Sequence, residues 1–437
     1  MLKAILSHDF RHTAINQLWK LFSGPALLIL IPFYLSSEAQ GYWYTFVSLA
    51  ALAVFADMGF STILLQFSAH EFAHLRFKSD KTLVGSKEHL ERLATLLRFA
   101  MKWSSGMGIL AFPIILAVGF VVLNKKQTDI NWIIPWIVYG SASIVAFINS
   151  MLLSFIEGCN SVGEVQRIRF YISLVTVILT GILLVLDTEL YALSISLCMG
   201  GLSGTIIIFY RYKHMLKQLF VLSGQVEYNW GKDTLPLIGR YAVSWMSGYF
   251  IFSIFTPIAF HYYGVIEAGQ IGFSIAICTA IFSIANIWMT IIVPKINIYV
   301  AHKDYKILNK MFKTHLISAV CTYMLGIFTL FIIVIFMSGI LPLADRLVGT
   351  FSLAIVSLSW LLQLILSAYA VYMRAHKEEP LMIPSFVSGV YITIVTLLIA
   401  KYLPFEYFFL GFLSSYLWGM PWVIVIFKRY NKKVIHE

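Results

Sequence analysis

Charged residues are scarce in this sequence. Asp, Glu, Lys and Arg make up 12% of its 437 residues, whereas 59% are hydrophobic. Soluble domains carry roughly 25% charged residues, so a chain this poor in charge cannot cover a surface that faces water. The apolar residues also come in blocks of about 20, the length needed to cross roughly 30 Å of hydrocarbon. The sequence therefore predicts an all-α polytopic membrane protein.

Reactive and ligand-binding motifs are also missing. The four cysteines are far apart and have no CxxC spacing, which argues against a disulfide framework and a metal site. The chain has no GxxxxGK[ST], HExxH or GxSxG pattern, so neither ATP binding nor a catalytic triad is indicated. Its loops are too short for the large external site of a membrane glycan polymerase. We therefore expect no enzyme activity, no metal and no cofactor.

Twelve apolar segments are long enough to be membrane spans: 15–35, 41–68, 98–123, 132–156, 170–187, 190–210, 235–260, 268–294, 315–338, 351–372, 381–403 and 405–427. Lys and Arg concentrate in cytoplasmic loops, which tests this count independently. With the N-terminus inside, the cytoplasmic segments hold 24 Lys and Arg and the outer loops hold only 3. A miscounted span would destroy this bias, so both termini are expected in the cytoplasm.

The net charge of +11 follows from the same asymmetry, because the excess of basic residues lies on the predicted cytoplasmic face. A basic cytoplasmic face is attracted to anionic membrane lipid. The charge is therefore explained without a nucleic-acid partner, and none is expected.

Short sequence matches suggest that the chain consists of two duplicated halves. The predicted division is an N-terminal lobe of six helices over 1–214, a cytoplasmic linker over 215–234 and a C-terminal lobe of six helices over 235–437. Each half carries SG in its first span, and EAQGYW in the first half matches EAGQIGF in the second. Because six is even, the halves would insert with the same orientation, as parallel repeats.

Four segments together resemble a known transporter family. They are ALAVFADMGFSTILLQFSAHEFA with its D-x-G, the loop SSEAQGYW, the link FIEGCNSVGEVQRIRF, and IANIWMTIIVPKI. With twelve spans and short loops, they resemble the O-antigen or lipid-linked oligosaccharide flippases of the multidrug/oligosaccharidyl-lipid/polysaccharide exporter superfamily. The resemblance implies two six-helix lobes around a central cavity that opens alternately to either side of the bacterial inner membrane.

This resemblance implies a substrate and partners. The substrate would be a polyprenyl diphosphate-linked oligosaccharide, such as an O-antigen or capsule repeat unit used in lipopolysaccharide and polysaccharide biosynthesis. The protein would act as a monomer alongside a glycan polymerase and a chain-length partner, with transport coupled to H⁺ or Na⁺. A multidrug or organic-ion exporter of the same superfamily is the main alternative, and a membrane glycan polymerase is a weaker one.

Five basic residues and one acid lie within the predicted spans: Lys20, Arg98, Lys102, Arg240, Lys401 and Asp57. Charges in a membrane usually face the protein interior or a water-filled cavity, although long basic side chains near a helix end can reach the headgroups. Lys20 and Arg240 open the first spans of the two halves and are expected to face each other across the cavity. Arg98 and Lys102 share a helix face and fit either role, whereas Lys401 is assigned to the headgroups.

The predicted substrate-binding set is therefore Lys20, Arg240, Lys102 and Arg98, whose positive charges would bind a diphosphate. Asp57 is the one acid well inside a span. It is interpreted as a coupling residue or an ion-pair partner of Lys20, or else as a structural acid beside Gly59. Aromatic side chains that can stack on sugars, or else form interfacial belts, are Trp19, Trp43, Trp245 and Tyr249.

Overall fold

The computed structural model describes residues 8–125, 128–224, 228–337, 342–376 and 380–436. Within these ranges eleven helices are long and apolar enough to cross a membrane, and a bent pair, α10 with α11, would make a twelfth span. The predicted all-α polytopic fold is confirmed. The side of the membrane on which the termini lie stays a prediction.

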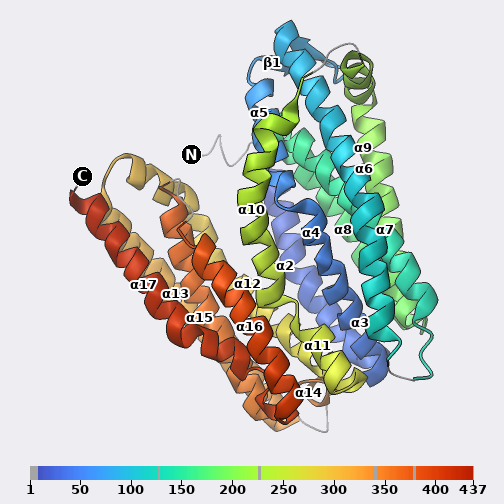
Figure 1. Cartoon of the computed structure of the whole chain (residues 1–437), viewed down its shortest axis with the longest axis vertical. Coiled ribbons are helices and arrows are strands. Elements are labelled where there is room, and N and C mark those ends of the chain that lie inside the picture. The colour runs from blue at the N-terminus through green and yellow to red at the C-terminus, as the bar shows by residue number, and fades with distance from the viewer. Residues whose placement is uncertain (1–7, 126–127, 225–227, 338–341, 377–379, 437) are drawn as a thin grey trace. The chain divides into compact units, whose positions relative to one another are not determined.

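Contacts divide the chain into two units (Figure 1). The first comprises Met1–Leu30 with Phe46–Met246, and the second Ile31–Thr45 with Ser247–Glu437. The boundaries between the units fall inside three helices, α2, α3 and α10, and not in loops. The sequence predicts a different division, into two six-helix halves joined by a linker at 215–234, and this stays a prediction.

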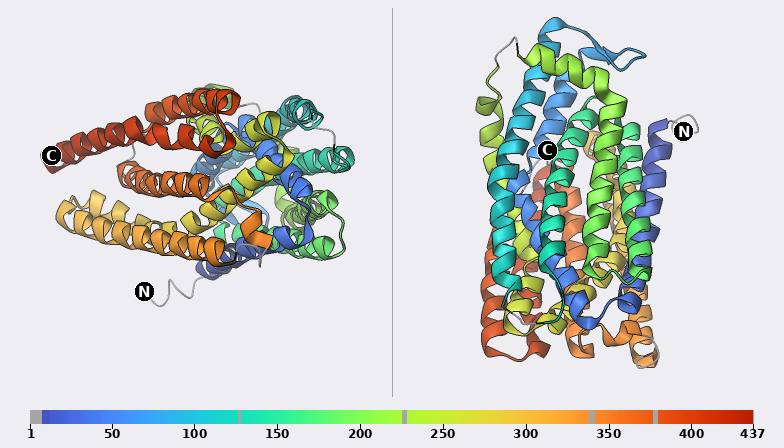
Figure 2. Two further views of the ribbon diagram at one scale, coloured as in Figure 1. Left: turned by 90° about the horizontal axis from the view of Figure 1, so that it is seen from below. Right: turned by 90° about the vertical axis from the view of Figure 1, so that its right-hand side faces the viewer.

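The first unit is built mainly from α4 to α9, together with parts of α2, α3 and α10. Its elements are α2 (His8–Tyr34), α3 (Ser37–Ala50), a 3-10 turn (Ala51–Ala53), α4 (Val54–Asp57), α5 (Phe60–Phe72), β1 (Leu75–Phe77), β2 (Leu83–Gly85), α6 (Lys87–Leu123), α7 (Ile133–Gly158), α8 (Val162–Val185), α9 (Leu190–Ser223) and α10 (Trp230–Phe252). Its long helices lie side by side in Figure 2. Helices α8 and α9 are separate, as the sequence predicts.

The second unit contains the remaining helices. They are α11 (Phe255–Tyr262), α12 (Val265–Ala301), α13 (Tyr305–Met337), α14 (Pro342–Asp345), α15 (Thr350–Arg374), α16 (Met382–Tyr402), a 3-10 turn (Phe405–Tyr407) and α17 (Leu410–His436). A cluster of aromatic rings forms part of its core, where Phe255 packs against Phe408, Phe409 and Phe412.

The start of α3 belongs to the second unit because it packs closely on the start of α12. A Cβ atom on Gly41 would overlap the carbonyl oxygen of Val265, and one on Gly269 would lie 2.9 Å from the Gly41 nitrogen. Gln40 is buried there and donates to the Gly269 carbonyl at 3.0 Å. Two backbones can approach this closely only where no side chain intervenes.

The predicted second span, 41–68, is interrupted. Helix α4 ends at Asp57, and α5 begins at Phe60 after two residues in the left-handed region, Met58 (φ 48°) and Gly59 (φ 76°). Few residues other than glycine adopt this conformation at low cost. The D-x-G motif therefore marks a break between helices.

The segment between α5 and α6 forms a small β-hairpin at one end of the first unit (Figure 2). Strands β1 and β2 are antiparallel, with Leu75 opposite Gly85. The hairpin is fixed to α9, because Leu83 accepts and donates backbone hydrogen bonds of 2.8 Å with the Gln218 side chain. At its tip Lys81 forms an ion pair of 3.1 Å with Glu164 of α8.

Candidate functional site

A chain of polar side chains connects α2, α7 and α8 within the first unit. The buried Asn16 donates from Nδ2 to Oε1 of Gln166 at 2.8 Å, and Gln166 donates from Nε2 to Oε1 of Glu157 at 3.3 Å. The other oxygen of Glu157 pairs with Nη2 of Arg169 at 2.8 Å. Unpaired polar groups are costly in an apolar environment, so this connected set stabilises the contact between the helices.

Lys20 lies one helical turn beyond Asn16 and is exposed. Among the described residues it has neither a hydrogen-bond acceptor nor an ion-pair partner. The nearby Arg169 guanidinium repels its ammonium group. The neighbouring Trp19 donates to the Ser173 hydroxyl at 3.1 Å and anchors α2 on α8. Because Glu157 balances only one of the two cations, this group of residues, the α2–α8 cluster, has an excess of positive charge.

The sequence did not identify Glu157, Gln166 and Arg169 as members of a site. They lie between the predicted spans 132–156 and 170–187, in a segment that the sequence predicts to be a cytoplasmic loop. In the structure α7 continues to Gly158 and α8 begins at Val162, so the connection is short. Gln166 and Arg169 are three residues apart on α8, a spacing that puts both on one helix face. This spacing is the sequence feature from which a polar site on α8 could have been predicted.

Asp57 has a structural role at the helix break. Its Oδ1 accepts the backbone N–H of Ser61 at 2.9 Å, and its Oδ2 accepts the Ser61 hydroxyl at 2.9 Å. The carboxylate therefore caps the first turn of α5, where backbone N–H groups have no partner within the helix. The structure corrects the expected pair of Lys20 with Asp57: both residues are described, and no ion pair joins them.

Helix α10 covers the other side of this break. A Cβ atom on Gly59 would lie 2.8 Å from Cβ of Tyr241 and 3.0 Å from Cδ1 of Trp245. Trp245 is 43% exposed, so part of its ring stays accessible beside the break. Arg240 belongs to the same helix, but its side chain lies outside the described residues.

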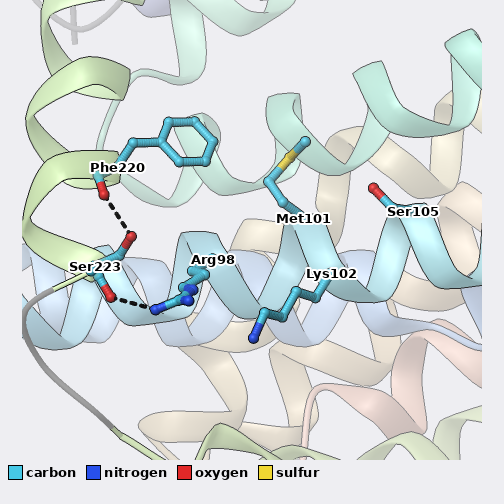
Figure 3. Close-up of a pocket in the computed structure, with 7 residues that line it drawn as sticks. Arg98, Met101, Lys102, Ser105, Phe220 and Ser223 are labelled. Atoms are coloured by element: carbon cyan, nitrogen blue, oxygen red, sulfur yellow. Dashed lines mark hydrogen bonds between the residues drawn. The ribbon is translucent and has the colours of Figure 1, made fainter.

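Arg98 and Lys102 line a shallow pocket of about 440 Å³ between α6 and the end of α9 (Figure 3). Arg98 donates from Nη1 to the carbonyl of Ser223 at 2.9 Å. Figure 3 shows both basic side chains on the same side of α6, as their spacing predicts. Their nearest pocket-lining neighbours on α9, Phe220 and Ser223, bring no negative charge.

The other predicted aromatic residues are buried. Trp43 is 4% exposed and Tyr249 is 5% exposed, and the Tyr249 ring packs edge-on against Phe250. In this structure these two rings contact protein and are not accessible to a sugar. Within the described ranges, no group of three or more His, Cys, Asp or Glu is placed to hold a metal ion.

The fold is similar to those of several solved membrane transporters. The structure is similar to an inward-facing MATE family multidrug resistance transporter of the MOP superfamily (12% identity, 95% of this chain and 96% of the other, TM-score 0.62). It is also similar to the lipid II flippase MurJ in an inward closed conformation (13% identity, 95% and 87%, TM-score 0.66). The MATE transporter VcmN of Vibrio cholerae is a third similar structure (10% identity, 100% and 99%, TM-score 0.52).

These neighbours are transporters and a flippase, and none is an enzyme. Solved structures of this fold include inward-facing and outward-facing conformations of a MATE family transporter. No protein-family model matches the chain, and no curated protein matches its sequence. At these low identities, the likeness shows the fold alone.

Proposed function

We propose that this protein flips a polyprenyl diphosphate-linked oligosaccharide, such as an O-antigen or capsule repeat unit, across the bacterial inner membrane. The observation that carries the proposal is the excess positive charge of the α2–α8 cluster. Lys20 has no counter-ion among the described residues, because the carboxylate of Glu157 pairs with Arg169. A diphosphate supplies the missing negative charge through charge-assisted hydrogen bonds.

A lipid-linked oligosaccharide needs such a site in order to cross the membrane. A diphosphate and a sugar chain cannot enter hydrocarbon unaided, because isolated charges and unpaired hydroxyls are costly there. A transporter of this fold would shield them while it changes between two conformations, and binding would shift the population of these conformations. The likeness to a lipid II flippase supports a lipid-linked substrate.

The proposal includes the orientation of the protein in the membrane. The bias of Lys and Arg toward alternate loops favours termini in the cytoplasm. Loading would occur from that side, release would follow outside, and a glycan polymerase with its chain-length partner would use the product. Return of the empty transporter would be coupled to H⁺ or Na⁺, with Asp57 as the candidate acid.

Export of organic cations is the competing function, and the charges of the first unit do not favour it. A cationic drug requires an acid that is free to pair with it. Glu157 is engaged by Arg169, and Asp57 is engaged by Ser61. These two acids are therefore occupied.

Lys20→Gln provides the test, because Lys20 has no partner in the described structure and its removal leaves no buried group unpaired. Hydrogen bonds to charged groups contribute roughly 1.5–3 kcal/mol, so binding should weaken on the order of 10- to 150-fold. The assay follows flipping of polyprenyl diphosphate-linked oligosaccharide in proteoliposomes, and surface glycan in cells that lack the native protein. Lys401→Gln is the matched control, because it removes a lysine at the other predicted membrane face.

Arg169 requires a paired variant, because removing it alone would leave Glu157 uncompensated. The double variant Glu157→Gln with Arg169→Gln leaves the excess charge of Lys20 in place but removes the Arg169 donors, and should impair flipping less than Lys20→Gln does. Normal flipping in this double variant and in Lys20→Gln would overturn the role of the α2–α8 cluster. Transport of cationic dyes with no effect of gene deletion on lipid-linked oligosaccharide would instead identify a multidrug exporter.

A further inference from the structure

The pocket that contains Arg98 and Lys102 is separate from the α2–α8 cluster. Its walls are α6 and the end of α9, and its lining residues are Arg98, Met101, Lys102, Ser105, Phe220, Ser223 and Gly224. Both basic side chains are exposed. No carboxylate among the described residues pairs with either of them.

The length of α6 places this pocket at the surface of the hydrocarbon. Residues 103–123, which complete α6, contain no charged side chain. At 1.5 Å per residue these 21 residues span about 31 Å, which matches the thickness of the hydrocarbon core. Lys102 therefore lies at the boundary of the hydrocarbon, and Arg98 lies one turn further out, at the level of the lipid headgroups.

The part of α6 beyond Lys102 has a broad exposed apolar surface. Beyond Lys102 and the exposed Ser105, the large exposed side chains of this helix are apolar: Ile109, Leu110, Ile114, Val118 and Val121. Ile109 is 78% exposed. A surface this apolar is compatible with acyl chains and not with water. Ile109 lies seven residues beyond Lys102 and so on the same helix face, and the two cations therefore adjoin this apolar surface.

We propose that this pocket binds the phosphate headgroup of an anionic phospholipid from the surrounding bilayer. The Lys102 ammonium and the Arg98 nitrogens that Ser223 does not use would contact the phosphate, and the acyl chains would lie against the exposed apolar side chains of α6. Basic pockets between helices at a membrane surface suit anionic headgroups. The same bond from Arg98 to Ser223 holds the end of α9 against the pocket.

The test uses the full-length protein in nanodiscs of phosphatidylcholine with a small fraction of phosphatidylglycerol. Retained phosphatidylglycerol is counted by native mass spectrometry after release. One cation near an anionic surface contributes about fivefold in binding. We therefore expect Lys102→Gln to weaken retention about fivefold, and the double variant with Arg98→Gln about 25-fold.

Lys213→Gln with Lys217→Gln is the matched control, because these lysines are also exposed, lie four residues apart on α9 and do not line the pocket. We expect this control to retain phosphatidylglycerol as the unmodified protein does. Lys102→Gln keeps the bond from Arg98 to Ser223, so its loss of lipid cannot be attributed to unfolding of that contact.

Three results would overturn the proposal. Equal retention by the pocket variants and the control variant would show that the pocket does not select anionic lipid. Displacement of the lipid by millimolar inorganic phosphate would identify a site for soluble phosphate. Displacement by low concentrations of polyprenyl diphosphate would assign the pocket to the transported substrate. We expect neither competitor to remove the bound phosphatidylglycerol, whatever the outcome of the transport assays on Lys20.

Discussion

Replacing Gly59 with alanine should destabilise the first unit far more than a typical glycine substitution. The residue has φ of 76°, and alanine in the left-handed region loses roughly 1–2 kcal/mol. The new methyl group would also lie 2.8 Å from Cβ of Tyr241 and 3.0 Å from Cδ1 of Trp245. Carbon atoms pack best at about 3.5–4.0 Å, so α10 must move outward.

Overpacking of this kind typically costs about 1–3 kcal/mol. Together with the backbone strain, the free energy of unfolding should fall by about 2–5 kcal/mol. Gly106→Ala is the matched control, because Gly106 lies within α6 and has nothing within 4 Å of the added atom. There alanine should stabilise the helix by up to about 1 kcal/mol.

The assay is equilibrium unfolding of the purified protein in mixed micelles, with Gly59→Ala, Gly106→Ala and the unmodified chain compared side by side. A double-mutant cycle with Trp245→Ala separates the two causes, because truncation of the ring relieves part of the overlap and none of the backbone strain. If Gly59→Ala proves as stable as Gly106→Ala, residue 59 does not adopt the left-handed conformation against α10.

Three further predictions concern the same unit. Asp57→Asn should keep the cap of α5 and change stability little, whereas Asp57→Ala should cost about 1 kcal/mol in equilibrium unfolding. Loss of transport by a stable Asp57→Asn protein would then identify a coupling acid, and normal transport a structural one. Gln218→Ala should leave the Leu83 backbone groups unpaired, at roughly 1–3 kcal/mol, and speed amide hydrogen exchange across the hairpin; unchanged exchange would contradict that contact. Hydrogen bonds from Thr82 hold the pKa of Asp80 below its usual range, so this carboxylate stabilises the turn above its ordinary pKa and loses that effect as pH falls. Thr82→Val should raise the pKa of Asp80 in an NMR titration.

The membrane helices could be predicted because the bilayer sets their length. Apolar blocks near 20 residues long are required whatever the packing, so the count of eleven or twelve agrees with the structure. The hairpin over 75–85 was missed because each strand has only three residues, too short for an alternating pattern to be recognised.

The site was harder to predict because it depends on packing between distant segments. Asn16 and Gln166 are 150 residues apart, and no local pattern indicates that α2 lies against α8. Asp57 was correctly singled out as unusual, but its partner was expected on another helix. The partner is Ser61, four residues away, because a break between helices creates unpaired N–H groups that a nearby carboxylate satisfies.

Residues 31–45, near the start of the chain, belong to the second unit, and this has a consequence for synthesis. Proteins generally begin to fold from the N-terminus as the ribosome extends the chain. Gln40, however, pairs with Gly269 and Arg346, which are 229 and 306 residues further along the chain. In return, Trp230 donates to Thr95, 135 residues before it, and helps to complete the first unit. A nascent chain that stops before Trp230 therefore leaves both units incomplete. The partners of α3 are synthesised only after α10, so α3 enters the membrane without them.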